Sequence, residues 1–299
     1  MPRSVRRVTV CLDGSPQGEA LVRQAAALAR RLPAGLIGLR SLQRPSPSPA
    51  ETFARGTGAI HEVLEHQAAQ EQALVLAARN AFAAVVRPFG VEAEFRPVWN
   101  DDPQAIARAA DGDLVVLGRP RLPGLPEALT AERLLLKASR PVLVVPEDWD
   151  EDLGRRVLIG WNGSPAARQA VDQALGLMGP DAAVTILIVD EAAAAESAVE
   201  LAGTLGAAGV RTAVQRADSH GDGVAEAITA AANAARADLV VLGGYSRSPS
   251  VERWFGGVTR SLLASARHPL LLSHVPEAAR GAVIDNDGAA GPATLAAYR

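Results

Sequence analysis

The chain has 299 residues, of which 48 % are hydrophobic and 21 % are charged, and its formal net charge is −3. This composition excludes a largely disordered chain, and the near-neutral charge argues against a nucleic-acid-binding protein, which would be strongly basic. Charges, glycines or prolines interrupt every apolar run before the roughly 18 residues that a membrane-spanning helix needs. We therefore expect a folded protein that partners neither nucleic acid nor membrane.

The expected elements of the first half are read from β-branched runs that alternate with alanine-rich helical stretches, a pattern typical of parallel βαβ units. Strands are expected at 5–12, 35–41, 91–98, 113–118 and 141–145, and helices at 16–32, 59–88, 102–110 and 127–139. The second half repeats the pattern, with strands expected at 156–161, 183–189, 210–216, 238–243 and 269–273, and helices at 165–178, 192–208, 222–236 and 257–267.

An internal repeat supports this division. The segment 8–21 matches 157–171, the hexapeptide Asp-Leu-Val-Val-Leu-Gly occurs at 113–118 and again at 238–243, and 140–145 matches 268–273. We expect an α/β protein of two tandem doubly wound five-stranded parallel sheets, each with strand order 3-2-1-4-5 and helices on both faces. The expected domains are 1–150 and 151–276, followed by a C-terminal tail at 277–299.

The fifth strand of each half would end at a sheet edge, and an exposed apolar edge invites pairing. We therefore expect the two halves to pair these edges around a pseudo-twofold axis, and a homodimer is left open. The single cysteine, Cys11, cannot form an intramolecular disulfide, which fits a reducing compartment. The first residues also lack the apolar stretch and cleavage site of a signal peptide. Both observations lead us to expect a cytoplasmic protein.

Candidate binding residues gather in two loops of the second half. In a doubly wound sheet a ligand binds beyond the carboxyl ends of the strands where the strand order reverses, here between the first and fourth strands. Gly256 and Gly257 follow the fourth strand and open a helix, whose unpaired N–H groups and positive dipole end favour a phosphate. Ser246 and Thr259 add hydroxyl groups, and Arg247 can pair with a phosphate oxygen.

These residues carry a resemblance to a known family. Gly243-x-x-Ser246, nine further residues, then Gly256-Gly257-Val-Thr and a helix is similar to the phosphate-binding signature of the universal stress protein family. Two tandem copies of this pattern would span nearly the whole chain. The resemblance implies a domain that binds an adenine nucleotide (ATP, ADP or AMP). It places Gly160, Trp161 and Asn162 near the nucleoside, Val189 near the adenine, and Gly243, Ser246, Gly256, Gly257, Val258 and Thr259 around the phosphates.

The chain departs from the family pattern at informative positions. Ser246 stands at the second glycine of the signature, and Gly257 stands at its Ser/Thr position. Asn162 replaces the usual aspartate and removes a negative charge that favours Mg²⁺, so the sequence argues against Mg²⁺ dependence. In the first half Ala128-Leu129 align with Gly256-Gly257 and the loop is three residues shorter. We expect the first-half site to be degenerate.

No catalytic motif accompanies this candidate site. The chain has no Walker lysine, no Gly-x-Ser-x-Gly elbow and no Gly-x-Gly-x-x-Gly fingerprint. His61 and His66 would lie about 140° apart on a helix, which does not predict a metal site. We interpret the chain as a nucleotide-binding stress-response protein that uses mainly its second half and has no efficient catalysis. Two alternatives stay open: a nucleotide-free structural or protein-interaction module, and a slow ATP hydrolase.

Overall fold

The first half of the chain forms five strands within the described residues. The computed structural model describes residues 5–12, 16–42, 56–99, 110–118, 140–146, 149–219, 223–244, 257–265 and 267–274. The strands are β1 (Arg7–Leu12), β2 (Gly35–Leu42), β3 (Ala93–Trp99), β4 (Leu114–Gly118) and β5 (Val142–Val145). The helices are α1 (Pro16–Arg31), the 30-residue α3 (Thr57–Val86) and the short η1 (Arg87–Phe89).

The second half repeats this alternation. Its strands are β6 (Arg156–Gly160), β7 (Ala183–Val189), β8 (Arg211–Ala217), β9 (Leu239–Gly244) and β10 (Leu270–His274). Its helices are α6 (Pro165–Leu175), η3 (Ala192–Ala194), α7 (Ala195–Ala207), α8 (Val224–Ala234) and α9 (Gly257–Ser265). The expected helices at 102–110 and 127–139 lie outside the described residues, apart from position 110.

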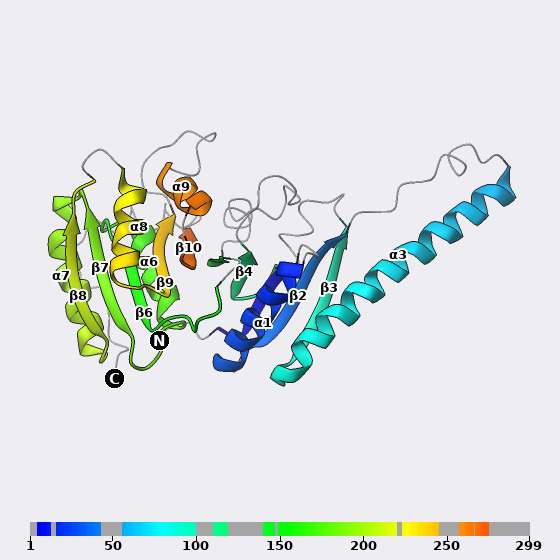
Figure 1. Ribbon diagram of the computed structural model, residues 1–299, viewed down its shortest axis with the longest axis horizontal. Helices are drawn as coiled ribbons and strands as arrows, with labels where there is room; N and C mark the ends of the chain where they lie inside the picture. Colours follow the sequence, from blue (N-terminus) through cyan, green and yellow to red (C-terminus); the bar gives the residue numbers. More distant parts are fainter. Residues whose placement is uncertain are drawn as a thin grey trace, which may run out of the picture.

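All ten described strands belong to one sheet, with the order β3-β2-β1-β4-β5-β10-β9-β6-β7-β8. Every pair within a half is parallel, and the two halves meet where β5 and β10 run antiparallel. Figure 1 shows the halves side by side along this sheet. The expected strand order and the pairing of the two fifth strands are therefore confirmed.

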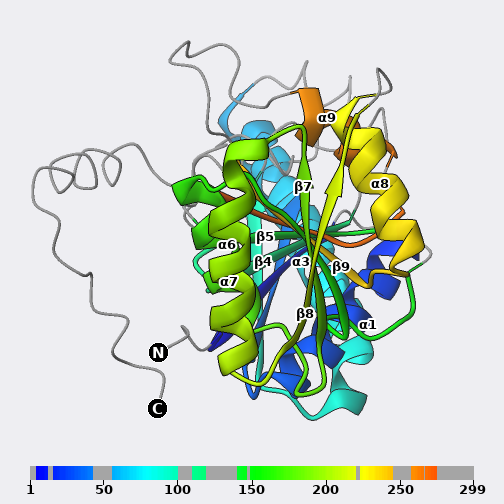
Figure 2. The same ribbon diagram turned by 90° about the vertical axis from the view of Figure 1, so that its left-hand side faces the viewer.

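Helices cover both faces of the second half, as Figure 2 shows, with α6 and α7 on one side of the sheet and α8 and α9 on the other. One buried cluster joins the strands to α1, α3, α6 and α7, and a second joins them to α8 and α9. β5, at the centre of the sheet, is apolar at every position, since it reads Val-Leu-Val-Val and is buried throughout. Strands of this kind need cover on both faces.

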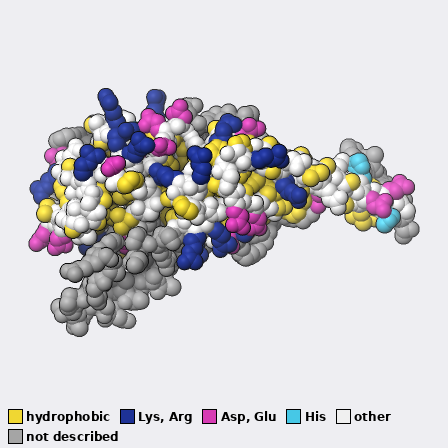
Figure 3. Space-filling view, turned by 90° about the horizontal axis from the view of Figure 1, so that it is seen from below, with side chains coloured by type: hydrophobic (Ala, Val, Ile, Leu, Met, Phe, Trp, Pro, Cys, Tyr) yellow, Lys and Arg dark blue, Asp and Glu magenta, His cyan; other side chains and the backbone are white. Residues whose placement is uncertain are grey.

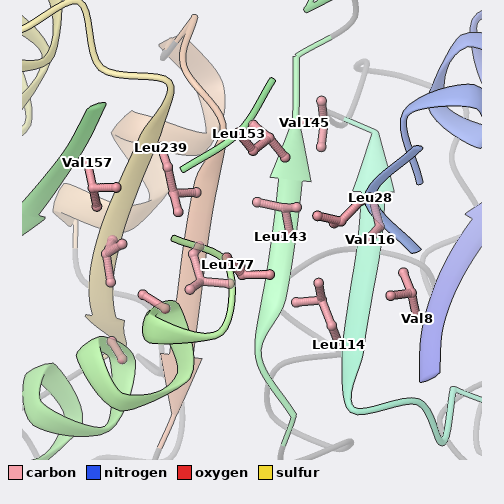
Figure 4. Close-up of a cluster of buried hydrophobic side chains, with 14 of the residues drawn as sticks. Val8, Leu28, Leu114, Val116, Leu143, Val145, Leu153, Val157, Leu177 and Leu239 are labelled. Carbon is pink, nitrogen blue, oxygen red and sulfur yellow. The ribbon is translucent and has the colours of Figure 1, made fainter. Parts of the chain in front are cut away.

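The joint between the halves is packed with leucines. Leu143 of β5 is fully buried, and Figure 4 shows Leu28 of α1 and Leu177 of the second half on either side of it. Arg31, in the last turn of α1, donates hydrogen bonds to the carbonyl oxygens of Leu153 and Leu177. The two halves therefore share side-chain packing as well as a sheet.

Candidate functional site

The second-half crevice is the space beyond the carboxyl ends of β6 and β9, at Gly160 and Gly243. These strands are parallel neighbours, with Gly160 in register with Leu242. The chain leaves β6 toward β7 on one side, while β9 lies on the other side, so the strand order reverses between them. Ligands of doubly wound sheets bind at such a reversal. The topology thus brings the ends of both predicted loops together.

Both glycines at this edge allow close packing inside the protein. A Cβ added to Gly160 would lie 2.6 Å from Cδ2 of Leu242, and one added to Gly243 would collide with the backbone nitrogen of Ala167 in α6. Gly243 therefore lets the first turn of α6 approach β9 closely. These two glycines therefore permit the close packing of β6, β9 and α6 beside the crevice.

Trp161 follows β6 directly, and its indole ring belongs to the core. The side chain is 3 % exposed, and its Nε1 donates to Oγ of Ser197 at 3.1 Å. The guanidinium of Arg168 lies 5.7 Å from the ring centroid. The sequence does not decide whether Trp161 is a lid residue over the site or a core residue. The structure places its ring among core side chains.

The next three residues form a hydrogen-bonded turn into α6. Oδ1 of Asn162 accepts from the backbone N–H of Ser164 at 3.1 Å, and Gly163 has a positive φ of 72°. Oγ of Ser164 then accepts from the N–H of Ala167 at 3.2 Å, so Ser164 is the N-cap of α6 and Pro165 is its first residue. The exposed Asn162 thus lies at the rim of the crevice with its amide oxygen engaged in the turn.

One further predicted residue, Val189, lies at the same edge, together with a carboxylate that the sequence analysis did not single out. Val189 ends β7, beside β6, and is 8 % exposed within the buried cluster under α8 and α9. Its neighbour Asp190 has a positive φ of 55°, and Oδ1 accepts from the N–H of Ser219 at 3.0 Å. This bond ties the carboxyl end of β7 to the residues that follow β8.

Helix α9 supplies the remaining described candidates. Gly257 is its first residue and is exposed, and a Cβ added there would meet no heavy atom within 4 Å. Val258 is half-buried, and Thr259 is 8 % exposed. The first N–H groups of a helix lack partners within the helix, so this terminus can offer donors to a ligand. Ser246, Arg247 and Gly256 lie outside the described residues.

Arg168 is a cation near the crevice that the sequence analysis did not single out. Its guanidinium donates to the carbonyl oxygen of Gly163 at 3.4 Å and faces the Trp161 ring. The sequence signal for this placement is that Arg168 follows the Ser164 cap by four residues. Residues four apart on a helix are neighbours on its surface, so Arg168 lies next to the first turn of α6.

Other reactive groups lie away from this edge. Burial raises the pKa of the Cys11 thiol to about 12, so Cys11 is a core residue and not a nucleophile. Within the described ranges no three His, Cys, Asp or Glu side chains are grouped so that they could hold a metal ion. A cleft of about 350 Å³ is lined by α1 and by residues 149–153, which precede β6 in the sequence. None of the residues that line it belongs to the second-half crevice.

The profile of the Universal stress protein family matches residues 4–146 and again residues 154–274. The chain therefore belongs to the universal stress protein family, in its tandem form. Among curated proteins, none matches the chain. In the part of the chain that the structure describes, none of the helices combines the length and hydrophobicity of a membrane crossing.

Two solved structures share the architecture across almost the whole chain. A universal stress protein from Archaeoglobus fulgidus DSM 4304 is 15 % identical, with a TM-score of 0.66, over 90 % of this chain and 98 % of that one. A functionally unknown protein from Pseudomonas aeruginosa PAO1 is 18 % identical, with a TM-score of 0.60, over 94 % and 96 %. At such identities the likeness bears on the fold alone.

Proposed function

We propose that the second-half crevice binds an adenine nucleotide with its phosphates at the N-terminus of α9. One observation carries the proposal: Gly257 begins α9 as an exposed residue with open space where a side chain would stand. A phosphate oxygen can therefore approach the first backbone N–H groups directly, and the helix dipole favours its charge. Membership of the universal stress protein family supports adenine as the base.

The rest of the crevice fits binding better than catalysis. Its described polar groups include the amide of Asn162, the hydroxyl of Thr259 and the guanidinium of Arg168, which hydrogen-bond or attract anions but do not take a proton at neutral pH. The carboxylate of Asp190 at the same edge is engaged by the N–H of Ser219. A hydrolase would need a group placed to activate water. We infer a protein whose nucleotide acts as a bound signal and is not turned over efficiently.

The first half is proposed to be a partner domain with a degenerate site. Ala128-Leu129 take the positions of Gly256-Gly257, and side chains there would hinder backbone approach to a phosphate. Residues 1–150 and 151–276 are the proposed units. We place the protein in the cytoplasm, supported by the single cysteine Cys11, which is buried and unpaired.

Calorimetric titration with ATP, ADP and AMP tests the binding site. The purified chain should bind about one nucleotide, and Gly257→Leu should weaken binding about 10- to 100-fold, because one charge-assisted hydrogen bond contributes roughly 1.5–3 kcal/mol. Gly203→Leu is the matched control, since Gly203 lies in helix α7, is exposed and also has nothing within 4 Å. Both variants should fold, so a loss confined to Gly257→Leu identifies the site.

Other outcomes separate the alternatives. No heat with any nucleotide, together with nucleotide-free protein in native mass spectrometry, would favour the structural or interaction module. Two nucleotides per chain would show that the first half is a working site. Steady phosphate release from ATP that Gly257→Leu abolishes would favour the slow hydrolase.

A further inference from the structure

Helix α3 extends well beyond the body of the molecule. At 1.5 Å per residue its 30 residues span about 45 Å. Its C-terminal part is anchored, with Ala78, Phe82 and Val86 buried against the first half, whereas none of the residues 58–77 is buried. Figure 1 shows this N-terminal part projecting past β3, and Figure 3 shows it as an arm with acidic and histidine side chains at its far end.

This arm concentrates the exposed large hydrophobic side chains. The described residues include six that are substantially exposed, and four of them belong to α3: Ile60 at 49 %, Leu64 at 58 %, Leu74 at 44 % and Leu76 at 54 %. Large apolar side chains that are exposed together on one element can mark an interaction site.

Three of the four continue the face that packs on the body. At about 100° per residue, Ile60, Leu64 and Leu74 fall within about 80° of one another, on the side of the helix that carries Ala78 and Phe82. Leu76 points about 160° away from Ile60. The surface that α3 buries at its C-terminal end therefore runs on, uncovered by any described element, along the arm.

The order of residues along this face is symmetric about the level of Ala69, which itself points to the opposite side of the helix. Residues at two, five and six positions before Ala69 match residues of similar character at the same distances after it. The matched pairs are Gln67 with Glu71, Leu64 with Leu74, and Val63 with Val75.

We propose that the arm pairs with the arm of a second copy of this chain, antiparallel and centred on Ala69. A twofold interface requires that if residue i contacts j, then j contacts i, and a face that is symmetric under reversal meets this condition. In the antiparallel pair, Leu64 of one copy faces Leu74 of the other, and Gln67 faces Glu71. Apolar side chains therefore contact apolar side chains, and an amide contacts a carboxylate. The paired length, from Val63 to Val75, is about 18 Å, and it stops short of Ala78, which the body of the same chain already buries.

This dimer leaves the sheet junction unchanged. The edges of β5 and β10 are already paired within one chain, so a second copy cannot use them. The tip of each arm would instead reach the point where α3 of the other copy joins its body, near Ala78. The second-half crevice lies in the other half of the molecule and plays no part in this contact.

Sedimentation velocity of the full chain over a range of micromolar concentrations tests the proposal. Wild-type protein should dimerise, and Leu64→Glu should weaken dimerisation about 100-fold or more, because an unpaired carboxylate would be buried against Leu74 of the other copy. Leu76→Glu is the matched control, since Leu76 is equally exposed on the opposite side of the same helix. It should leave the dimerisation constant within about threefold.

A rescue experiment tests the register. Leu64→Glu combined with Leu74→Lys in one chain places opposite charges together twice across the twofold axis, and should recover most of the lost affinity. Circular dichroism should show that all variants keep their helix content. A monomer at every concentration would overturn the proposal, as would a dimer that responds equally to Leu64→Glu and Leu76→Glu, or one that the double substitution does not recover.

Discussion

Leu143 and Leu271 lie directly opposite each other where β5 and β10 run antiparallel, and neither side chain is exposed at all. They belong to the same buried cluster, at the middle of the ten-stranded sheet. Each strand would otherwise present an unpaired apolar edge to solvent. The contact therefore joins two repeats that share one topology through a buried cluster common to both halves.

A double-mutant cycle measures this joint. Leu143→Ala and Leu271→Ala should each lower the free energy of unfolding by about 2–5 kcal/mol, and together by an amount that departs from additivity by about 0.5–3 kcal/mol because the residues are direct partners. Leu143→Ala with Ile186→Ala is the control, since Ile186 lies in β7, three strands away from β10. Urea denaturation supplies the values, and additivity within about 0.5 kcal/mol in both pairs would contradict the coupling.

Asp238, which precedes β9, fixes the start of β6. Its carboxylate is 1 % exposed and accepts hydrogen bonds from the backbone N–H groups of Gly154, Arg155 and Arg156 at 2.7–3.2 Å. Asp238→Ala leaves these donors without a partner and should cost about 2–4 kcal/mol in urea unfolding. Its repeat counterpart Asp113 is 40 % exposed, so Asp113→Ala should cost about 0.5–1.5 kcal/mol. Equal losses would show that burial does not set the difference.

The carboxylate of Asp238 should also make the free energy of unfolding depend on pH. Burial raises the pKa of Asp238 above its ordinary value, against the lowering effect of the backbone N–H groups. The folded state then holds a proton that the unfolded state has already released, so the contribution of Asp238 to stability falls as pH rises from about 4 toward the raised pKa. The unfolding free energy of wild type minus that of Asp238→Asn should decline over this window. A rise would mean that the three hydrogen bonds outweigh burial.

Most of the sheet could be predicted because its signals are local. Each apolar run between turn residues became a strand within about two positions of the expected bounds, as at 183–189, where β7 is Ala183–Val189. The antiparallel β5–β10 junction was also predicted, since two apolar edges related by a repeat can cover each other.

The candidate site was less predictable, because it depends on contacts between distant segments. Within the site, Trp161 hydrogen-bonds to Ser197 in α7. At the opposite end of the strands, outside the site, the role of Asp238 likewise depends on N–H groups more than eighty residues earlier. Neither contact can be read from the hydrophobic periodicity or the composition of the sequence. A repeated aspartate before both Leu-Val-Val-Leu-Gly strands was the available signal for Asp238. The projecting arm of α3 went unpredicted, since amphipathic spacing shows that a helix has an apolar face but not what covers it.

Arg31 should contribute more to stability than its neighbour Arg30. The Arg31 guanidinium donates to the carbonyl oxygens of Leu153 and Leu177, the latter at 3.0 Å, and so links the first half to the second. Arg31→Ala should cost about 1–2 kcal/mol in urea unfolding. Arg30 lies 5.8 Å from the ring centroid of Phe89 within the first half, so Arg30→Ala should cost about 0.5 kcal/mol. A larger loss for Arg30→Ala would argue against this link.

Gly38 gives Phe82 room to anchor α3 on the sheet. A Cβ added at Gly38 would lie 2.5 Å from Cε2 of Phe82, whereas one added at Gly35, on the same strand, would meet its nearest neighbour at 3.8 Å. Gly38→Ala should therefore destabilise by about 1–3 kcal/mol through overpacking, while Gly35→Ala should be neutral or slightly stabilising because alanine orders more readily in a strand. Thermal and urea unfolding check both variants.

The combination of Gly38→Ala with Phe82→Leu separates overpacking from a backbone effect. The smaller side chain removes the ring that the new methyl group meets, so the double variant should lose less stability than the sum of the two single variants, by about 0.5–2 kcal/mol. Phe82 also lies 5.8 Å, between ring centroids, from Phe95 of β3, so Phe82→Leu alone should cost about 1 kcal/mol or more. If the two losses in unfolding free energy simply add, α3 must move to make room for the new methyl group. Gly38 would then not be required for Phe82 to pack on the sheet.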